Sequence, residues 1–474
     1  MKINNRRLLF GLVVNGVTVL FFFSCQPKPV LLKPALTGDG EIYLYLQALP
    51  QEAESLRVTL QEISAIKEGG TEIPLFLSVS ELNRAAVKRQ RFIASARLPS
   101  GYYSGLAFRA RNAFLKGEEG EAALLVPPEG AMVEFPFQVR KKRSSLFLLT
   151  FDYRKSMGAR FRFSPVFSVN APDRLVTSLL AYVVNYGSNT LTVFNKRNMQ
   201  VAGVIATGRG PSGIAIDSLL LKAYVALSGE DAVDVIDISS GEIVDNLRLR
   251  PADNPQGPVL TPDRRILLTV NTGSDTVSII DTPSLVEQTR IRVGDGPGAV
   301  RIDPRGRNAF VFNTLSNTIS VINLPNQRLE TVLSTEEGPL NGQFNRSGDR
   351  LFVIHERSPF MTVVDPISFT TLERVFVGRG ISSIRMDTKQ NLLYLGQKHR
   401  PFVEVYNSFS LLPVDSIQSN GGVAYMAIDD EENNLHLVVP EKKSLMAVNL
   451  ISKKMVGEID VGERPYEVGL VGER

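Results

Sequence analysis

Seven regularly spaced residues are the first candidates for chemistry in this sequence. Each lies two positions before a short alternating or apolar run, and the intervals between them are 44, 42, 42, 42, 41 and 43 residues. They are Arg209, Asp253, Asp295, Glu337, Arg379, Asn420 and Glu463. Six of the seven carry charge, two positive and four negative. Carboxylates can hold a divalent cation, and a ring of mixed charge can bind a ligand or partner, although loops also expose charge to solvent without any function.

Histidine offers little further chemistry, because the sequence contains only His355, His399 and His436. None has a Cys, Asp or second His at a metal-ligand spacing. We expect His355 and His399 to lie in loops on one rim, where they either share a metal or are simply solvated. The sequence contains no CxxCH, GxSxG, HExxH or Walker motif and no tryptophan. It therefore predicts no catalytic residue, no metal site and no cofactor.

A repeated phrase indicates the elements that position these residues. The stretches "YVVNYGSNTLTVFN", "TVNTGSDTVSIID" and "FVFNTLSNTISVIN" are near copies. Their last residues belong to a series with intervals of 42, 44, 42, 42, 42 and 42, namely Asn195, Asp237, Asp281, Asn323, Asp365, Asn407 and Asn449. Each follows an alternating or apolar run, as expected of a strand that ends in a turn. A second series keeps the same register and comprises Asp217, Thr261, Asp303, Asn345, Asp387 and Asp429.

A period near 42 residues with about four short strands in each repeat is typical of a β-propeller. The sequence predicts seven blades, the repeats beginning at the second strand of a blade ("AYVVN") and ending with an isolated innermost strand ("YEVGLV"). The last strand must then complete the first blade, which closes the ring and leaves only short outer edges. The seven candidate residues would lie around the mouth of the central channel.

The phrases resemble the YVTN family of β-propeller repeats. Asn185, Asn271 and Asn313, with their "SNT" or "SDT" sequels, carry the closest matches, and the resemblance extends over about residues 178–474. Later repeats diverge, with "VIHERSPF", "LGQKHRPF" and "VVPEKKSL" at the same place. The resemblance implies a propeller fold in an exported or surface protein and implies no reaction.

The region before the repeats predicts a separate all-β domain. Residues 41–170 alternate between polar and apolar side chains, which is typical of a half-buried antiparallel β-sandwich. The stretch "LPSGYYSGLAFRARNAFL" is similar to an uncharacterised domain of bacterial lipoproteins that is thought to be transthyretin- or immunoglobulin-like. We predict a linker at 171–180 and the propeller at 181–474.

The beginning of the chain has the pattern of an export signal. A basic stretch precedes 16 apolar-rich residues, as in a signal peptide. "FFSC" resembles the lipobox of bacterial lipoproteins, whose cysteine is acylated, although Phe22 and Phe23 depart from the usual residues there. We predict a signal peptide at 1–24, lipidation of Cys25 and a tether at 25–40; the alternative is a free cysteine in an ordinary signal peptide or anchor.

The charge distribution argues against a polyanionic partner. The net charge is +4, but three of the positive charges belong to Lys2, Arg6 and Arg7, so the rest of the chain sets 50 basic residues against 49 acidic ones. This balance gives no field able to hold nucleic acid. Gln26, rather than Asp, follows the cysteine, which favours the outer membrane over the inner one.

These observations lead to two hypotheses about function. The first is a lipid-anchored scaffold of the bacterial cell envelope whose propeller face binds a protein or a surface glycan. The alternative is a metal-dependent propeller hydrolase or lactonase, with Asp253, Asp295, Glu337 and Glu463 providing oxygen ligands at the channel mouth.

Overall fold

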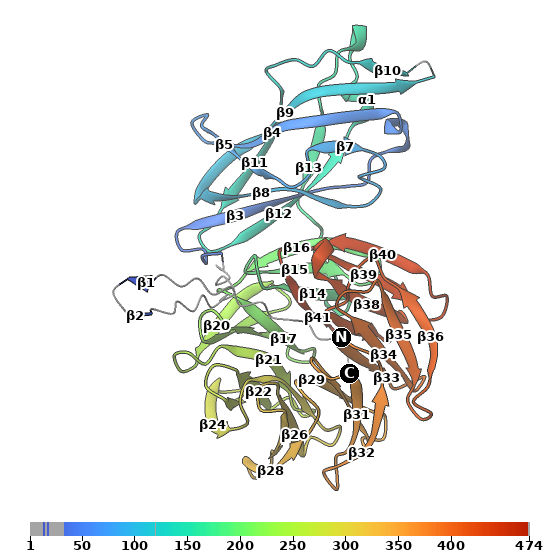
Figure 1. Cartoon of the computed structure of the whole chain (residues 1–474). Helices are drawn as coiled ribbons and strands as arrows, with labels where there is room; N and C mark the ends of the chain where they lie inside the picture. The colour runs from blue at the N-terminus through green and yellow to red at the C-terminus, as the bar shows by residue number, and fades with distance from the viewer. Residues whose placement is uncertain (1–12, 15–16, 19–32, 119, 473–474) are drawn as a thin grey trace. The chain divides into compact units, whose positions relative to one another are not determined.

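The computed structural model describes residues 13–14, 17–18, 33–118 and 120–472. The chain divides into two compact units, Met1–Leu32 and Lys33–Arg474. In the first unit β1 (Val13–Val14) pairs with β2 (Val17–Thr18), whereas Cys25 and most of the predicted signal peptide lie outside the described residues. Among the helices that the structure describes, none is long and apolar enough to cross a membrane. The second unit contains two β domains (Figure 1).

The first domain consists of two packed sheets. One contains β10 (Gly120–Ala123), β9 (Gly101–Gly117), β4 (Leu56–Lys67) and β5 (Glu72–Pro74), with β11 (Ala131–Val139) beside β9 and β7 (Glu81–Asn83) beside β4. The other contains β13 (Phe167–Asn170), β12 (Ser144–Phe151), β3 (Asp39–Leu46), β8 (Arg91–Pro99) and β6 (Phe76–Leu77). The short α1 (Tyr153–Ser156) follows β12. Side chains from both sheets, such as Leu44 and Phe108, share one buried core.

One pairing departs from the antiparallel arrangement predicted from the sequence. β12 lies parallel to β3, with Leu146 opposite Tyr43. A parallel neighbour requires a long crossover, and the chain between these two strands supplies it by building the opposite sheet. All other strand pairs described in this domain are antiparallel.

The second domain contains seven four-stranded sheets within the described residues. The first sheet has the order β16 (Gln200–Ala206), β15 (Thr190–Asn195), β14 (Leu180–Asn185) and β41 (Pro465–Leu470). The next three are β17 (Pro211–Asp217), β18 (Lys222–Leu227), β19 (Ala232–Asp237) and β20 (Glu242–Arg248); β21 (Pro255–Leu260), β22 (Ile266–Asn271), β23 (Thr276–Asp281) and β24 (Val286–Arg292); and β25 (Pro297–Ile302), β26 (Asn308–Asn313), β27 (Thr318–Asn323) and β28 (Arg328–Ser334). The last three are β29 (Pro339–Phe344), β30 (Leu351–His355), β31 (Phe360–Asp365) and β32 (Thr370–Phe376); β33 (Ile381–Asp387), β34 (Leu392–Gln397), β35 (Phe402–Asn407) and β36 (Pro413–Gln418); and β37 (Tyr425–Asp429), β38 (Asn434–Val439), β39 (Ser444–Asn449) and β40 (Met455–Asp460).

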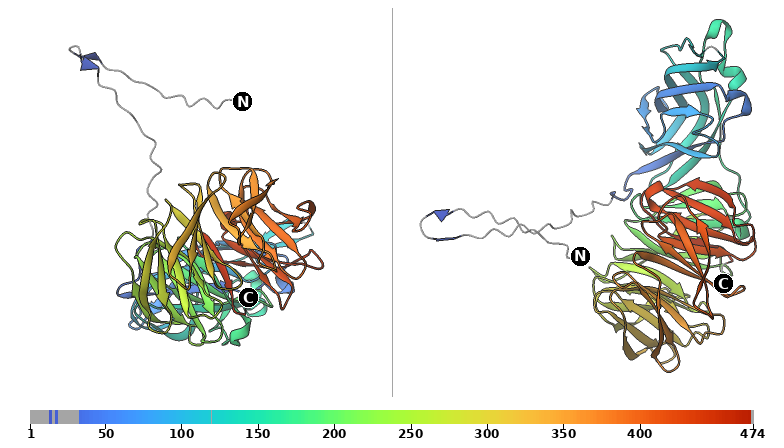
Figure 2. Two further views of the ribbon diagram at one scale, coloured as in Figure 1. Left: turned by 90° about the horizontal axis from the view of Figure 1, so that it is seen from below. Right: turned by 45° about the vertical axis from the view of Figure 1, so that its right-hand side comes forward.

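These sheets, drawn in two further views in Figure 2, follow one another around a ring. Their innermost strands contact one another in succession, from β17 through β21, β25, β29, β33 and β37 to β41, which contacts β17 again. β41 lies beside β14 (Figure 1) and is antiparallel to it, so the end of the chain completes the first sheet. Gly469 is opposite Tyr182 in this pairing. The all-β propeller architecture and its closure by the last strand are confirmed.

The asparagine of the repeated phrase ties two strands of one sheet together. Asn313 is fully buried at the end of β26, and its Nδ2 donates hydrogen bonds to Thr318 Oγ1 at 3.0 Å and Ser320 Oγ at 2.9 Å on β27. Asn185 and Asn271 make the equivalent pairs of bonds in their own sheets. Buried polar donors are usually hydrogen-bonded, and the hydroxyl-bearing residues that follow each asparagine accept from its amide N–H groups.

The "SNT" and "SDT" sequels connect each sheet to the next one. Asn317 has a positive φ of 57°, a conformation that asparagine tolerates. Its side-chain oxygen accepts a hydrogen bond at 2.9 Å from the N–H of Gly338, which precedes the innermost strand of the following sheet. Asn189 and Asp275 do the same with Gly210 and Gly296. The residues of the repeated phrase therefore have a structural role, because they form hydrogen bonds within a sheet and between neighbouring sheets.

Removing one of these asparagines should destabilise the propeller. We expect Asn313→Ala to lower the free energy of unfolding by about 1–3 kcal/mol, because the buried hydroxyl of Ser320 and the half-buried hydroxyl of Thr318 lose their donor. Chemical unfolding followed by circular dichroism measures the loss. The control is Asn326→Ala in an exposed turn, which we expect to change stability by less than about 0.5 kcal/mol; equal losses in the two variants would contradict the assigned role.

The first domain covers outer edges of the ring. The side-chain amide of Gln90 donates to Val201 O at 3.2 Å and accepts from Val201 N at 2.7 Å, so it pairs with the open edge of β16 as a strand would. Asp460, at the end of β40, accepts from Arg91 Nε at 2.7 Å and from the N–H of Phe92 at 3.0 Å. Tyr45 packs among buried apolar side chains of the propeller. Covering an edge in this way removes a site for unwanted strand pairing.

Candidate functional site

The structure brings the predicted rim together on one face of the ring. All seven candidate residues lie in loops that lead from the outermost strand of one sheet to the innermost strand of the next. In five of these loops, the backbone carbonyl of the candidate residue accepts a hydrogen bond from the turn between the second and third strands of the same sheet. The carbonyl oxygens are those of Arg209, Asp253, Asp295, Glu337 and Glu463. The loops and the turns therefore form one surface.

Five charged members of the rim and one tyrosine pair are accessible on this surface. Arg209, Asp295, Glu337, Arg379 and Glu463 are all exposed. Arg209 Nε lies 3.6 Å from Glu230 Oε1, and Lys443 Nζ donates to Glu463 Oε1 at 2.6 Å. Exposed ion pairs of this kind contribute little stability. Their charges remain available to a partner that approaches this face.

Asn420 is less accessible than the exposed charged residues of the rim. It is half-buried, and its Nδ2 donates to Glu458 Oε1 at 2.6 Å. Glu458 also lies 3.4 Å from Arg89 of the first domain. Asn420 therefore belongs to the contact between the domains as much as to the rim.

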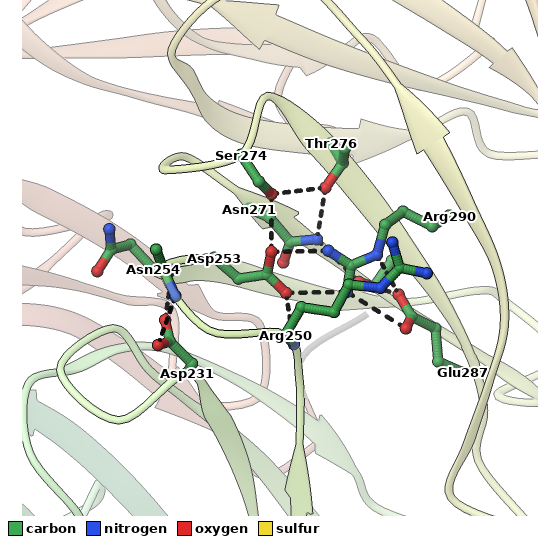
Figure 3. Close-up of polar contacts among 11 residues, drawn as sticks. Asp231, Arg250, Asp253, Asn254, Asn271, Ser274, Thr276, Glu287 and Arg290 are labelled. Carbon is green, nitrogen blue, oxygen red and sulfur yellow. Dashed lines mark hydrogen bonds and ion pairs between the residues drawn. The ribbon is translucent and has the colours of Figure 1, made fainter.

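Asp253 differs most from its equivalents, because it is fully buried. Arg290 on β24 holds both oxygens of its carboxylate, with Nη1 donating to Oδ1 at 2.6 Å and Nη2 to Oδ2 at 2.8 Å (Figure 3). Ser274 Oγ donates to Oδ1 at 2.7 Å and the N–H of Arg250 to Oδ2 at 2.9 Å. Burial alone raises the pKa of Asp253, but the hydrogen bonds from Arg290 and Ser274 outweigh it, so the pKa lies below its ordinary value.

The length of its loop explains why Asp253 is buried. Six residues separate β20 from β21, whereas four separate β16 from β17. Within the longer loop Ala252 and Asn254 have positive φ angles of 66° and 48°, and their N–H groups donate to Asp231 at 2.8 Å. This path turns Asp253 inward, where its oxygens are already occupied and unavailable to a cation.

The prediction that His355 lies in a rim loop is wrong. His355 is the last residue of β30 and is buried, in the position that Asn271 and Asn313 occupy in their sheets. Its Nδ1 lies 3.0 Å from Phe360 O and its Nε2 lies 2.9 Å from Thr335 Oγ1. Burial lowers the pKa of His355 to about 4 despite the opposing effects of the Phe360 carbonyl and of Glu336. It takes the place of the structural asparagine, whereas His399 is exposed in its loop.

The sequence analysis overlooked two groups of residues around the channel. On the rim face, Tyr186 and Tyr466 have ring centroids 6.5 Å apart, and the Arg464 guanidinium lies 5.7 Å from the centre of the Tyr186 ring. Toward the other face, Arg301 and Arg385 come from the innermost strands β25 and β33. Their interval of 84 residues, two repeat periods, was the available signal.

The described part of the chain contains no group of three or more His, Cys, Asp or Glu side chains that could hold a metal ion. In chemical terms, the arrangement on the rim offers hydrogen-bonding, charged and aromatic groups on a shared surface.

The fold and the rim define a β-propeller protein. A family model described as a YNCE-like beta-propeller matches residues 169–388. A functionally unknown protein from Desulfotomaculum acetoxidans DSM 771 is similar in structure, with a TM-score of 0.56, 16% identity, and coverage of 63% of this chain and 100% of that chain. Dihydro-heme d1 dehydrogenase NirN, in complex with DHE, has a TM-score of 0.50, 12% identity, and coverage of 64% and 78%. At these identities the similarity shows the fold alone. No match was found among proteins of curated function.

Proposed function

We propose that the protein is a lipid-anchored scaffold of the bacterial cell envelope that binds a protein or a surface glycan through the rim face of its propeller. The observation that carries this proposal is the composition of the face. Tyr466 is 42% exposed and lies three positions after Glu463. Leu315 is 68% exposed, and its N–H donates to Asp295 O at 3.2 Å. Tyrosine and arginine are the side chains that most often dominate binding energy at protein interfaces.

The anchor is supported by sequence features. The basic and apolar segment, the "FFSC" resemblance to a lipobox and the proline-rich stretch after Cys25 all favour an exported lipoprotein, with the outer membrane as the expected location. The similarity of the repeats to the YVTN family and of residues 41–170 to a lipoprotein domain fits the same assignment. A covalent lipid would hold the rim face close to envelope partners.

The hydrolase or lactonase alternative loses one of its proposed ligands. Both carboxylate oxygens of Asp253 accept hydrogen bonds from the guanidinium of Arg290. Lys443 Nζ donates a hydrogen bond to Glu463 Oε1. A cation would have to displace these donors. Only Asp295 and Glu337 remain as exposed carboxylates without such a contact among the predicted set.

Charge reversal on the rim tests the binding proposal. We expect the chain from Gln26 onward to capture one envelope protein or glycan, and the triple variant Asp295→Lys, Glu337→Lys, Glu463→Lys to capture at least tenfold less, since like charges disfavour association. The matched control reverses Glu330 and Glu373 on the outer strands β28 and β32 and should bind normally. Equal capture by both variants would refute the rim as the binding surface.

Metal analysis of the same samples distinguishes the alternative. About one equivalent of a divalent cation that is lost in the rim variant would favour hydrolysis. Separately, Cys25→Ser in cells should shift the protein from the membrane to the soluble fraction. Unchanged membrane association would overturn the anchor while leaving the rim proposal intact.

A further inference from the structure

A second feature of the propeller lies where four innermost strands end. A pocket of about 370 Å³ is lined by residues at the ends of β25, β29, β33 and β37 and by the loops that follow them. The rim loops precede these strands, so the pocket opens toward the other face of the ring. Its volume falls within the range of small-molecule sites.

The pocket is polar on one side because three successive strands depart from the repeat. Equivalent positions on the seven innermost strands are Ala215, Val259, Arg301, Gln343, Arg385, Ala427 and Gly469. Four of these residues are apolar or have no side chain, and the three polar ones are consecutive and all line the pocket. Packing within the sheets does not require arginine at this position, because four other sheets have alanine, valine or glycine there.

Arg301 provides hydrogen-bond donors toward this space. Its Nη1 donates to Val300 O at 3.2 Å, while its buried Nε has no hydrogen-bond partner among the described residues. A guanidinium carries five N–H donors and favours planar oxyanions. Arg346, which is exposed, adds a third positive charge to the lining.

The two acidic residues in the lining are already engaged. Asp387 Oδ1 accepts from the N–H groups of Lys389 at 2.9 Å and Gln390 at 3.0 Å. Asp430 Oδ1 lies 3.6 Å from Lys389 Nζ. Arg301 and Arg346 therefore face two carboxylates whose charge is partly satisfied by the turn that follows β33, which leaves the pocket suited to an anion. Arg385 also lines the pocket and has an interaction of its own.

We propose that this pocket binds a small organic anion through a carboxylate or phosphate group. Arg301, Gln343 and Arg385 would hold the oxygens, since arginine can donate two parallel hydrogen bonds to either group. Ile302, Phe344 and Met386 line the same pocket and offer contact to an apolar body. The site is independent of the rim, so its ligand does not have to be the envelope partner.

Calorimetric titration of the full-length chain in detergent tests the proposal with three probes: phenyl phosphate, benzoate and inorganic phosphate. We expect phenyl phosphate or benzoate to bind with one equivalent, and more tightly than inorganic phosphate because of the apolar walls. Arg301→Gln should weaken binding roughly tenfold, as expected for loss of a charge-assisted hydrogen bond. Arg305→Gln, an exposed arginine in the loop after β25, should bind as the unaltered chain does.

Arg346→Gln provides a second variant that is not expected to affect folding, since the side chain is exposed. Binding weakened by both Arg301→Gln and Arg346→Gln, with unchanged thermal unfolding, supports the site. No binding of any probe, or equal binding by the Arg305→Gln and Arg301→Gln proteins, overturns it. Loss of binding in the rim variant but not in the Arg301→Gln protein also overturns it, because the anion would then bind on the other face.

Discussion

Replacement of Asp253 by alanine is expected to lower the free energy of unfolding by about 3–5 kcal/mol, because the change leaves a buried guanidinium without its carboxylate. The side chain of Arg290 is only 9% exposed and that of Asp253 1% exposed. Glu287 stays within 2.9 Å of Arg290 Nε and compensates part of the lost charge. Chemical unfolding at pH 7 measures the difference between the variant and the unaltered chain.

Two variants separate the ion pair from a general effect of the loop. Asp295→Ala changes the equivalent residue of the next repeat, which is exposed, and should cost less than about 0.5 kcal/mol. Asp253→Ala combined with Arg290→Met removes both charges and should recover part of the stability, since an apolar side chain can replace a buried ion pair. The structural role of the pair would be refuted by equal losses in Asp253→Ala and Asp295→Ala.

Acidity should weaken the same pair. The pKa of Asp253 lies below its ordinary value in the folded protein, so the unfolded chain binds a proton more readily than the folded one as the pH falls. The stabilisation is therefore complete above the ordinary carboxyl pKa of about 4 and is lost below it. Asp253→Ala should narrow the difference between the stabilities at pH 7 and pH 3.

The ring could be predicted from the sequence because the spacing of the repeated residues reflects hydrogen bonds between residues close in sequence. Asn313 bonds to residues five and seven positions later, and Asn317 bonds to Gly338, 21 positions later. Such contacts recur in the first, third and fourth sheets, and the same residue types at the same spacing make the period visible there. The parallel pairing of β12 with β3 could not be predicted in this way, because it produces no repeated pattern in the sequence.

The site was harder to predict, because its key residues differ from the residues at the equivalent positions of the other repeats. The longer interval before Asp253 was visible, but its consequence depends on Arg290, 37 positions away. The two extra residues change the direction of the side chain, which a register alone does not specify. Conversely, Arg301, Gln343 and Arg385 follow the register faithfully, and only the ring shows that three successive strands place them in one pocket.

His355 illustrates a correction that the register could have provided. It lies 42 positions after Asn313, so the repeat assigns it to the end of a strand. Its loop-like surroundings, "VIHERSPF", suggested a turn instead. A buried histidine at a position that asparagine fills elsewhere has consequences for the pH dependence of stability, as does the second buried histidine, His436.

Between pH 7 and pH 5 the protein is expected to lose about 4 kcal/mol of stability through these two histidines. Burial lowers the pKa of His436 to about 3, with a further contribution from nearby Lys196, and that of His355 to about 4. Both folded values lie below the unfolded value of about 6.5, so acid favours the unfolded chain. The stability that the two neutral histidines contribute is complete above pH 6.5. It declines as the pH falls toward the pKa values of the folded protein, by about 2 kcal/mol for each histidine at pH 5.

The repeats supply a matched replacement for each histidine. Equivalent positions in the other sheets place Tyr182, Tyr224, Leu268, Phe310, Phe352 and Tyr394 where His436 lies. His436 is fully buried, and neither ring nitrogen has a hydrogen-bond partner among the described residues. His436→Phe should therefore keep the fold. His355→Asn restores the residue of the third and fourth sheets and offers a donor to Thr362 Oγ1, which is buried without a partner in the described chain.

Urea unfolding at pH 7, 6 and 5 provides the test. Each single variant should remove about half of the loss that the unaltered chain suffers between pH 7 and pH 5, and the double variant should remove nearly all of the part attributed to histidine. His399→Asn is the control, because its imidazole is exposed in the folded protein and should leave the curve unchanged. If the double variant follows the same pH curve as the unaltered chain, the two histidines are not the groups that take up protons on unfolding, and their burial in neutral form would be disproved.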